Sequence, residues 1–315
     1  MNSFDRKDES MELTVSNLKK NFDQNEVLHG ISFSITSGKA LGLLGRNGAG
    51  KTTTIRILMD VFKADSGTVL MDGKPFIASE YKIGYLPEER GLYPKKRVDE
   101  QLIYLAGLRG ATKQEAKAST KKWLKRLGIE EYEKRKLETL SKGNQQKVQL
   151  AQTLLCDPDI VILDEPFSGL DPVNSQVLKD VVKELIQNGK LVIFSSHQMS
   201  YVEEFCEDIV IMHKGNIVLQ GNLKQIKKEF GKHQLVLSAL QTSNVDLQKF
   251  CETKLKGLVE VKEQKQEGFI LALHQGVSKQ DVLQVLIQQQ IDIEKFMIYE
   301  PSLTDIFVAK AGYEV

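Results

Sequence analysis

Cysteine is scarce in this sequence, with three residues (Cys156, Cys206 and Cys251) among 315. They are odd in number, widely spaced and form no C-x-x-C pair, which argues against a disulfide framework and against a zinc site. Such usage is typical of a reducing, cytosolic setting. Excess charge is also missing, because 43 Lys+Arg stand against 42 Asp+Glu. Net charge therefore gives no indication of a nucleic-acid partner or of an anionic surface.

Long hydrophobic runs are absent as well. A helix that crosses a bilayer needs about 18 consecutive apolar residues, and no stretch of this sequence approaches that length. Residues 1–11 lack the apolar segment of a secretion signal, and we expect residues 1–10 to form a disordered lead-in. A role at a membrane would therefore require another subunit. With 41% hydrophobic and 27% charged residues, the composition is that of an ordinary globular protein, long enough for one large domain or two unequal ones.

A glycine-rich stretch fits the phosphate-binding pattern G-x-x-x-x-G-K-[ST]. Its residues are Gly45, Arg46, Asn47, Gly48, Ala49, Gly50, Lys51, Thr52 and Thr53. Residues 40–44 before it are apolar, as in a buried strand, and apolar residues recur at helical spacing after it. The glycines let several N–H groups converge on one anion, while Lys51 would reach the β- and γ-phosphates of a nucleotide and Thr52 would ligate Mg²⁺. A plain glycine-rich turn is the alternative.

Two acids follow a second apolar strand at residues 160–163. Asp164 and Glu165 stand at its carboxyl end, where open α/β sheets bind ligands. We predict that Asp164 holds Mg²⁺ and that Glu165 orients and partly deprotonates the attacking water. A third apolar strand, residues 191–196, leads to His197, which would contact the γ-phosphate. Taken singly, these residues would also fit solvated acids and a structural histidine.

Between the phosphate loop and the acids, residues 140–146 (LSKGNQQ) begin a helix. Ser141 and Gly143 at its start are a second place where an anion could dock, although the same pattern describes a capped helix. After the acids, residues 168–171 form a turn that ends in Asp171.

The remaining pattern predicts the fold around these residues. Residues 13–18 and 31–35 alternate as half-buried antiparallel strands. Phe22 falls on a loop between them, where its ring would either pack in the core or stack on an adenine base. A helical insertion is expected over about residues 88–158, with a capping box of Thr112 and Glu115.

From residue 234 the pattern is β-α-β-β-α-β, the ferredoxin-like order. The predicted fold is therefore α/β: a P-loop NTPase domain with an antiparallel β subdomain and the helical insertion (residues 11–230), plus a small C-terminal α+β domain (231–315). Because the tail contains no ligand-type cluster, we expect it to serve packing or regulation.

The order of these pieces resembles one family. GRNGAGKTT, LSKGNQQ, IVILDEP, SGLD and SSH follow one another, over about residues 11–223, as in the ATP-binding subunits of ABC transporters. The resemblance implies that two such subunits sandwich two ATP molecules between the phosphate loop of one chain and the signature motif of the other. Ser141 and Gly143 would then reach the partner's γ-phosphate, and Asp171 would couple the two sites. Phe22 falls where the family usually places an adenine-stacking aromatic residue.

The sequence departs from the family pattern in its signature and in one ligand. The signature reads LSKGN rather than LSGGQ, so Lys142 and Asn144 replace Gly and Gln. Glu88 stands where a Gln metal ligand is usual, and a carboxylate would hold metal or water differently. GYLPEERGLYP together with LSKGN is similar to a branch of bacterial sodium- and drug-extrusion ATPases, and the tail supports that branch.

The predicted function is an ATPase, with ATP and Mg²⁺ as cofactors, that powers export through a separate membrane permease. Its partners would be a second ATP-binding subunit, identical or paralogous, and the permease, but no nucleic acid. The permease would contact the helical insertion and the loop at residues 88–93. The chain would act in the cytoplasm, peripheral to the inner face of the plasma membrane. The alternatives are a soluble ABC-type ATPase acting on ribosomes or DNA, and a small-molecule kinase or GTPase.

Overall fold

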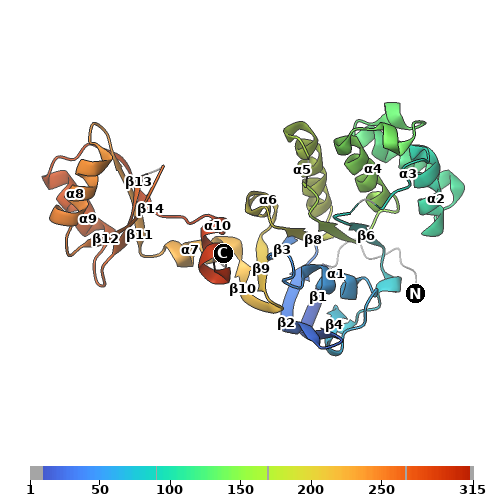
Figure 1. Ribbon diagram of the computed structural model, residues 1–315, viewed down its shortest axis with the longest axis horizontal. Coiled ribbons are helices and arrows are strands. Elements are labelled where there is room, and N and C mark those ends of the chain that lie inside the picture. The colour runs from blue at the N-terminus through green and yellow to red at the C-terminus, as the bar shows by residue number, and fades with distance from the viewer. Residues whose placement is uncertain (1–9, 90, 169, 267, 313–315) are drawn as a thin grey trace. The chain divides into compact units, whose positions relative to one another are not determined.

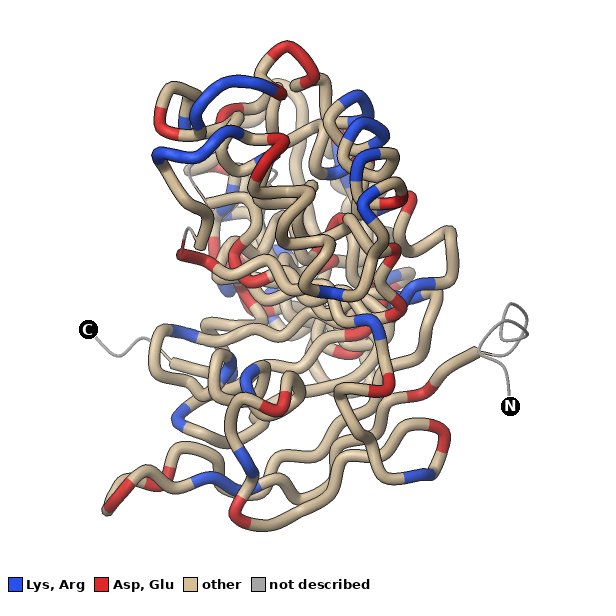
Figure 2. Tube along the Cα trace, turned by 90° about the vertical axis from the view of Figure 1, so that its right-hand side faces the viewer, with Lys and Arg blue, Asp and Glu red and all other residues tan. Residues whose placement is uncertain are grey.

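The computed structural model describes residues 10–312 except 90, 169 and 267. Apart from residue 10, the predicted lead-in lies outside the described residues, as does Gly169 of the predicted turn. Contacts divide the described chain into two compact units, one ending at Leu223 and one running from Lys224 to Gly312. Lys and Arg positions are interspersed with Asp and Glu positions along the trace (Figure 2).

A six-stranded sheet forms the centre of the first unit, with the strand order β10-β9-β3-β8-β7-β6. Five strands run parallel, and β10 closes the edge as an antiparallel hairpin with β9. The strands are β3 (Ala40–Leu44), β6 (Ile83–Leu86), β7 (Ile160–Asp164), β8 (Leu191–Ser196), β9 (Asp208–His213) and β10 (Asn216–Asn222). The residues of β3, β7 and β8 are all buried, which explains why these strands appear in the sequence as continuous apolar runs.

A second, antiparallel sheet packs beside the first, with the order β2-β1-β4-β5. Its strands are β1 (Glu12–Phe22), β2 (Asn25–Thr36), β4 (Ser66–Met71) and β5 (Lys74–Pro75). One hydrophobic core joins both sheets to helix α1 (Lys51–Leu58), through side chains such as Leu13, Phe33, Leu43 and Ile55. The predicted antiparallel subdomain is thereby confirmed. Phe22 is the last residue of β1, paired with Asn25, and not part of a loop as expected.

The helical insertion gathers beside β6 (Figure 1). It contains α2 (Val98–Leu108), α3 (Lys113–Arg126) and α4 (Lys142–Leu154), with short 3₁₀ turns at Glu130–Tyr132 and Leu137–Thr139. The predicted capping box is present, since the Thr112 backbone N–H donates to Glu115 Oε2 at 2.8 Å and the Glu115 N–H donates to Thr112 Oγ1 at 3.3 Å. A further 3₁₀ turn at Ala78–Glu80 precedes β6, and helices α5 (Pro172–Gln187) and α6 (Met199–Phe205) flank β8.

The second unit is the predicted β-α-β-β-α-β arrangement. Its elements are β11 (Gln234–Ala239), α8 (Asn244–Lys254), β12 (Val259–Lys265), β13 (Gly268–Leu273), α9 (Lys279–Gln288) and β14 (Ile293–Ile298), followed by α10 (Leu303–Ala311). The antiparallel sheet has the order β12-β13-β11-β14 and its own core. Helix α7 (Leu223–Gly231) falls almost wholly in this unit, so the chain divides earlier than the boundary predicted at residue 230.

Candidate functional site

Three neighbouring parallel strands bring the predicted site residues to one edge of the sheet. Strand β8 lies between β3 and β7. In the register of these strands Leu44 lies opposite Ser196, and Asp164 lies opposite Ser195. The phosphate loop after β3, the acids at the end of β7 and the histidine after β8 therefore emerge side by side. The strand order, which the sequence does not contain, makes these separate segments a single site.

The phosphate loop has the backbone that its glycines permit. Gly48 and Gly50 have φ angles of 80° and 102°, and a Cβ on Gly50 would lie 2.7 Å from Leu28 Cδ2. Helix α1 begins at Lys51. The Lys51 ammonium donates to the carbonyl of Gly45 at 2.6 Å and of Arg46 at 3.3 Å. The Lys51 side chain is thus folded back over the carbonyl groups of its own loop.

The turn of the β9–β10 hairpin is hydrogen-bonded to this loop. The Gly215 N–H donates to the Ala49 carbonyl at 3.2 Å, and the His29 N–H of β2 donates to the Gly215 carbonyl at 3.0 Å. His213 and Lys214 on the same turn line the cavity above the loop. The sequence did not predict the contribution of this hairpin to the site. No local signal marked it, because the contact depends on β9 lying next to β3.

Two hydroxyl groups hold the buried Asp164 carboxylate. Ser195 Oγ donates to Asp164 Oδ1 at 2.7 Å, and the Tyr85 hydroxyl of β6 donates to Asp164 Oδ2 at 3.4 Å. Hydrogen bonds to a charged group typically contribute about 1.5–3 kcal/mol, with shorter bonds contributing more. Ser195 and Tyr85 were not predicted, although the SSH ending of β8 does place hydroxyls next to the histidine.

Glu165 is held in a similar way by the residues that follow β8. Ser196 Oγ donates to Glu165 Oε2 at 3.1 Å, and His197 Nδ1 lies 2.8 Å from Glu165 Oε1. The backbone of Glu165 has a φ of 48°, and its N–H donates to the Ser195 carbonyl at 2.9 Å. Glu165 and His197 are therefore in direct contact.

Burial and charge shape the electrostatics of this site. Burial lowers the pKa of Lys51, while the carboxylates of Glu165, Asp164 and Glu88 raise it in opposition. For Asp164, burial is the largest influence and raises the pKa, and the neighbouring Glu165 adds to the rise. Burial and then the Asp164 carboxylate raise the pKa of Tyr85 to about 12, so its hydroxyl keeps the proton that it donates. Lys51 and Asp164 thus oppose the effect of burial on each other's pKa.

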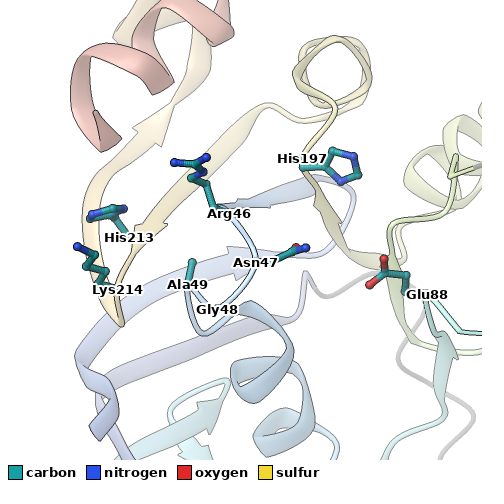
Figure 3. A pocket seen from close by; sticks show the side chains of 8 residues that line it. All are labelled: Arg46, Asn47, Gly48, Ala49, Glu88, His197, His213 and Lys214. Atoms are coloured by element: carbon teal, nitrogen blue, oxygen red, sulfur yellow. The ribbon is translucent and has the colours of Figure 1, made fainter. Parts of the chain in front are cut away.

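Two cavities lie over the phosphate loop. The smaller, of about 270 Å³, is lined by residues 46–53 together with Val27, Glu88, Asp164 and Glu165. The larger, of about 600 Å³, is lined by residues 46–49, Glu88, His197, His213 and Lys214. Figure 3 shows the loop between Glu88 and His197 on one side and His213 and Lys214 on the other. The smaller cavity is thus lined by most of the predicted phosphate residues, by Glu165 and by the three predicted metal ligands.

The residues present fit a magnesium ion bound together with a nucleotide. Among the described residues, no three His, Cys, Asp or Glu side chains group closely enough to hold a metal by themselves. Mg²⁺ is usually held by one or two carboxylates, with phosphates and water completing its shell. Asp164 and the Thr52 hydroxyl line the same cavity as the loop, and Glu88 lines it from the loop after β6. Gln149 of α4 anchors that loop by donating to the carbonyls of Pro87 and Glu89.

Comparison with known proteins connects this geometry to a family. The model of the ABC transporter family matches residues 28–168, and the model of the C-terminal domain of DrrA1-3-like ATP-binding proteins matches residues 221–311. The chain is 43% identical to the ABC transporter ATP-binding protein YhaQ of Bacillus subtilis, over 95% of this chain and 98% of that protein. This chain belongs to the ABC transporter ATP-binding proteins.

Further relatives are consistent with this family. The linearmycin resistance ATP-binding protein LnrL of Bacillus subtilis is 30% identical over 95% of this chain and 98% of its own length. The solved structure of CbiO1 from Clostridium perfringens, described as part of the ABC transporter complex cbiONQ, matches with a TM-score of 0.60 and 28% identity, covering 70% of this chain and 92% of that one. The chain is thus a nucleotide-binding ABC ATPase. These transporter relatives give no support to a ribosome- or DNA-acting ATPase.

The signature residues of this ABC ATPase lie apart from the cavities. Ser141 caps α4 by accepting from the Asn144 N–H at 3.3 Å, and Asp171 caps α5 by accepting from the Asn174 N–H at 2.9 Å. A Cβ on Gly143 would lie 2.5 Å from Asn174 Nδ2, so the two helix starts are packed together. Neither cavity is lined by Ser141, Gly143 or Asp171.

Phe22 also lies outside the lining of both cavities. Its ring is 37% exposed and meets the Phe62 ring edge-on, with centroids 5.2 Å apart. Lys20 Nζ lies 5.3 Å from the centroid of the same ring. Adenine stacking by Phe22 therefore stays a prediction. In the described part of the chain no helix is long and apolar enough to span a bilayer.

Proposed function

We propose that this ABC ATPase binds MgATP and uses its hydrolysis to drive export through a separate membrane permease. The observation that carries the proposal is the convergence of Lys51, Asp164 and Glu165 on one cavity at the ends of β3 and β7. Export is the inference from LnrL, whose name assigns it to drug resistance. A separate permease is the inference from CbiO1, which is described as part of a larger transporter complex.

The roles of the chain's residues follow from their positions. The N–H groups of residues 45–53 and the Lys51 ammonium would bind the phosphates. Asp164, Thr52 and Glu88 would hold Mg²⁺, which when bound supplies positive charge beside the phosphates. Glu165 would orient and partly deprotonate the attacking water, because its carboxylate is buried beside the loop and held by Ser196. His197, 58% exposed and in contact with Glu165, would turn toward the γ-phosphate.

A second chain is part of the proposal. Ser141, Gly143 and Asp171 stand at exposed or closely packed helix starts, outside both cavities. Helix N-termini favour anions, so Ser141 and Gly143 would serve the γ-phosphate of a partner chain, while Asp171 would couple the two sites. ATP binding would close the pair, and hydrolysis would let it reopen.

The permease contact is proposed for a groove at the edge of the insertion. It measures about 830 Å³ and is bounded by the end of α1, by β6 and by α2 and α4, with Asp60, Lys82, Arg109 and Gln152 among its lining residues. It adjoins the Glu88 loop through Pro87. Replacing Arg109 by Glu is expected to lower the fraction of the chain recovered with cell membranes while ATP binding is kept.

The test of the ATP site is direct. Lys51→Ala removes the ammonium group from the loop, and equilibrium dialysis with ATP should show that binding falls by at least about tenfold. Nucleotide binding at the wild-type level in this variant would remove Lys51 from the site. Hydrolysis that proceeds equally well in excess EDTA would remove Mg²⁺ from the proposal.

A further inference from the structure

Tyr85 of β6 lies between the nucleotide cavity and the proposed permease groove. Its hydroxyl is 3.4 Å from Asp164 Oδ2, and the residue also lines the groove. Its backbone carbonyl accepts from Thr153 Oγ1 of α4 at 3.1 Å, and Thr153 lines the same groove. Tyr85 is therefore fixed at its backbone, while its hydroxyl reaches the carboxylate predicted to hold Mg²⁺.

The two hydroxyl donors to Asp164 differ in how firmly they are placed. Ser195 is fully buried on the strand next to Asp164, in direct register with it, and its bond is 2.7 Å long. The sheet therefore fixes the backbone of this donor directly opposite its acceptor. The Tyr85 contact is 3.4 Å long, near the limit for an O–H···O bond, and its donor stands at the end of a partly buried ring. A small displacement of that ring would shorten or break the contact.

We infer that Tyr85 is a positioning residue for Asp164, through which an occupant of the groove changes how well the site holds Mg²⁺. The inference rests on the proposed function, in which Asp164 holds the metal and the permease occupies the groove. Partners of metal ligands orient the ligand, and their loss typically weakens metal binding. Here one such partner also forms part of a surface where another molecule would dock.

The first test measures the contribution of Mg²⁺ to nucleotide binding without turnover. The full chain is titrated with AMP-PNP in excess Mg²⁺ and again in EDTA. The Mg²⁺ ratio, which is the dissociation constant in EDTA divided by that in Mg²⁺, is then compared between variants. Ser195→Ala should reduce the ratio by roughly tenfold, and Tyr85→Phe by about threefold, since its contact is longer. Tyr104→Phe removes a hydroxyl from an exposed side chain of α2 and should leave the ratio unchanged.

A thermal melt of each variant shows whether it is folded. A Tyr85→Phe chain that melts like the wild type and keeps the wild-type ratio would overturn the positioning role. If the wild-type chain binds no AMP-PNP in either buffer, the proposed nucleotide function itself fails, and the inference fails with it.

The second test places a substitute occupant in the groove. Cys156 is partly exposed and lines the groove, whereas Cys206 and Cys251 are buried, so a maleimide should label Cys156 selectively. Burial also raises the pKa of the Cys206 and Cys251 thiols, which further protects them. The adduct should change the Mg²⁺ ratio by about twofold or more in the wild-type chain and cause no further change in Tyr85→Phe. A Cys156→Ser chain treated with the same reagent is the control.

The comparison between labelled chains decides the groove part of the inference. An adduct that changes the ratio equally in wild type and in Tyr85→Phe would show that the groove acts by another route. An adduct without effect on the labelled wild-type chain would show that the groove does not act on the metal site. Either outcome leaves the proposed ATPase function standing.

Discussion

Glu165 is the residue at which folding and chemistry conflict most clearly. Its φ of 48° costs a residue with a side chain about 1–2 kcal/mol. Its carboxylate is also buried, where a charge is costly unless it is hydrogen-bonded. Ser196 and His197 supply those bonds, one to each carboxylate oxygen. Such strain persists where the surroundings impose it, which is consistent with a catalytic position.

Glu165→Gln removes the charge and the base but keeps the shape of the side chain. ATP binding should remain, while turnover should fall by about 10²–10⁴-fold, the usual contribution of a general base. ATP-bound dimers should then accumulate and be visible by size-exclusion chromatography with ATP in the running buffer. Turnover at the wild-type rate would assign the base to another residue.

In the nucleotide-free chain, the ionised Asp164 should lower the stability of the fold at neutral pH. Because burial raises its pKa in the fold, its contribution to stability is largest when it is protonated and declines as pH rises from the unfolded value of 3.8 through the raised folded value. Asp164→Asn removes this penalty and keeps an acceptor for Ser195. Its melting temperature at pH 7 without nucleotide should rise by about 2–4 °C, for about 1 kcal/mol.

With MgATP present, we expect the wild-type chain to gain more thermal stability than the Asp164→Asn variant. MgATP should raise the melting temperature of the wild-type chain more than that of Asp164→Asn, because the variant lacks the metal ligand. A variant that melts below the wild type without nucleotide would show that the carboxylate stabilises the fold rather than burdening it.

Residues carrying their own signal could be predicted, whereas their supporting partners could not. Lys51, Asp164 and Glu165 stand next to apolar strands in a spacing that the chemistry requires. Ser195 and Tyr85 are ordinary strand residues in the sequence, and they contact Asp164 only because β8 and β6 both neighbour β7. Register is a property of the assembled sheet, so a single sequence does not contain it.

Whole elements were predicted correctly where their pattern was long, and misjudged at their ends. The β-α-β-β-α-β order of the second unit is confirmed, because alternation and helical spacing are both clear there. Helix α1 ends at Leu58, although Val61 and Phe62 continue the apolar spacing. The chain turns at Asp60, with a φ of 60°, and this lets the Phe62 ring pack against Phe22.

The starts of α4 and α5 behave as one structural element. Gly143 of α4 leaves room for the Asn174 amide, which donates to Asp171 Oδ2 at 2.5 Å. Asp171 in turn caps α5. Asn174 therefore connects Gly143 of the predicted signature to Asp171. A larger residue at position 143 should displace Asn174 and so alter the position of Asp171.

Gly143→Ala places a Cβ where the Asn174 amide now lies and should displace it from Asp171. We expect ATPase turnover to fall by roughly tenfold to a hundredfold, as for small misplacements of reacting groups. ATP binding by the separate chain should be kept, since the phosphate loop is unchanged. Gly107→Ala is the matched control, because it also lies in a helix and its Cβ would meet nothing within 4 Å. Equal turnover in both variants would contradict the coupling.

At the scale of the whole molecule, the predicted site residues form two groups. Lys51, Asp164 and Glu165 line the cavity, whereas Ser141 and Asp171 stand at helix starts outside it. One chain therefore offers a nucleotide site and, elsewhere on its first unit, the start of α4, where an anion is favoured, beside the start of α5 that Asp171 caps. Two copies related by a twofold axis would each complete the other's site.

Complementation between two inactive chains tests this arrangement. A Lys51→Ala chain keeps its signature but not its phosphate loop, and a Ser141→Arg chain keeps the loop but blocks the signature. Each alone should be inactive as a pair of identical copies. In an equal mixture half of the pairs are mixed, and each mixed pair has one of its two sites built entirely from intact parts, so about a quarter of the wild-type ATPase activity should return. If the mixture stays inactive while wild-type chains alone are active, the signature of one copy does not serve the phosphate loop of another.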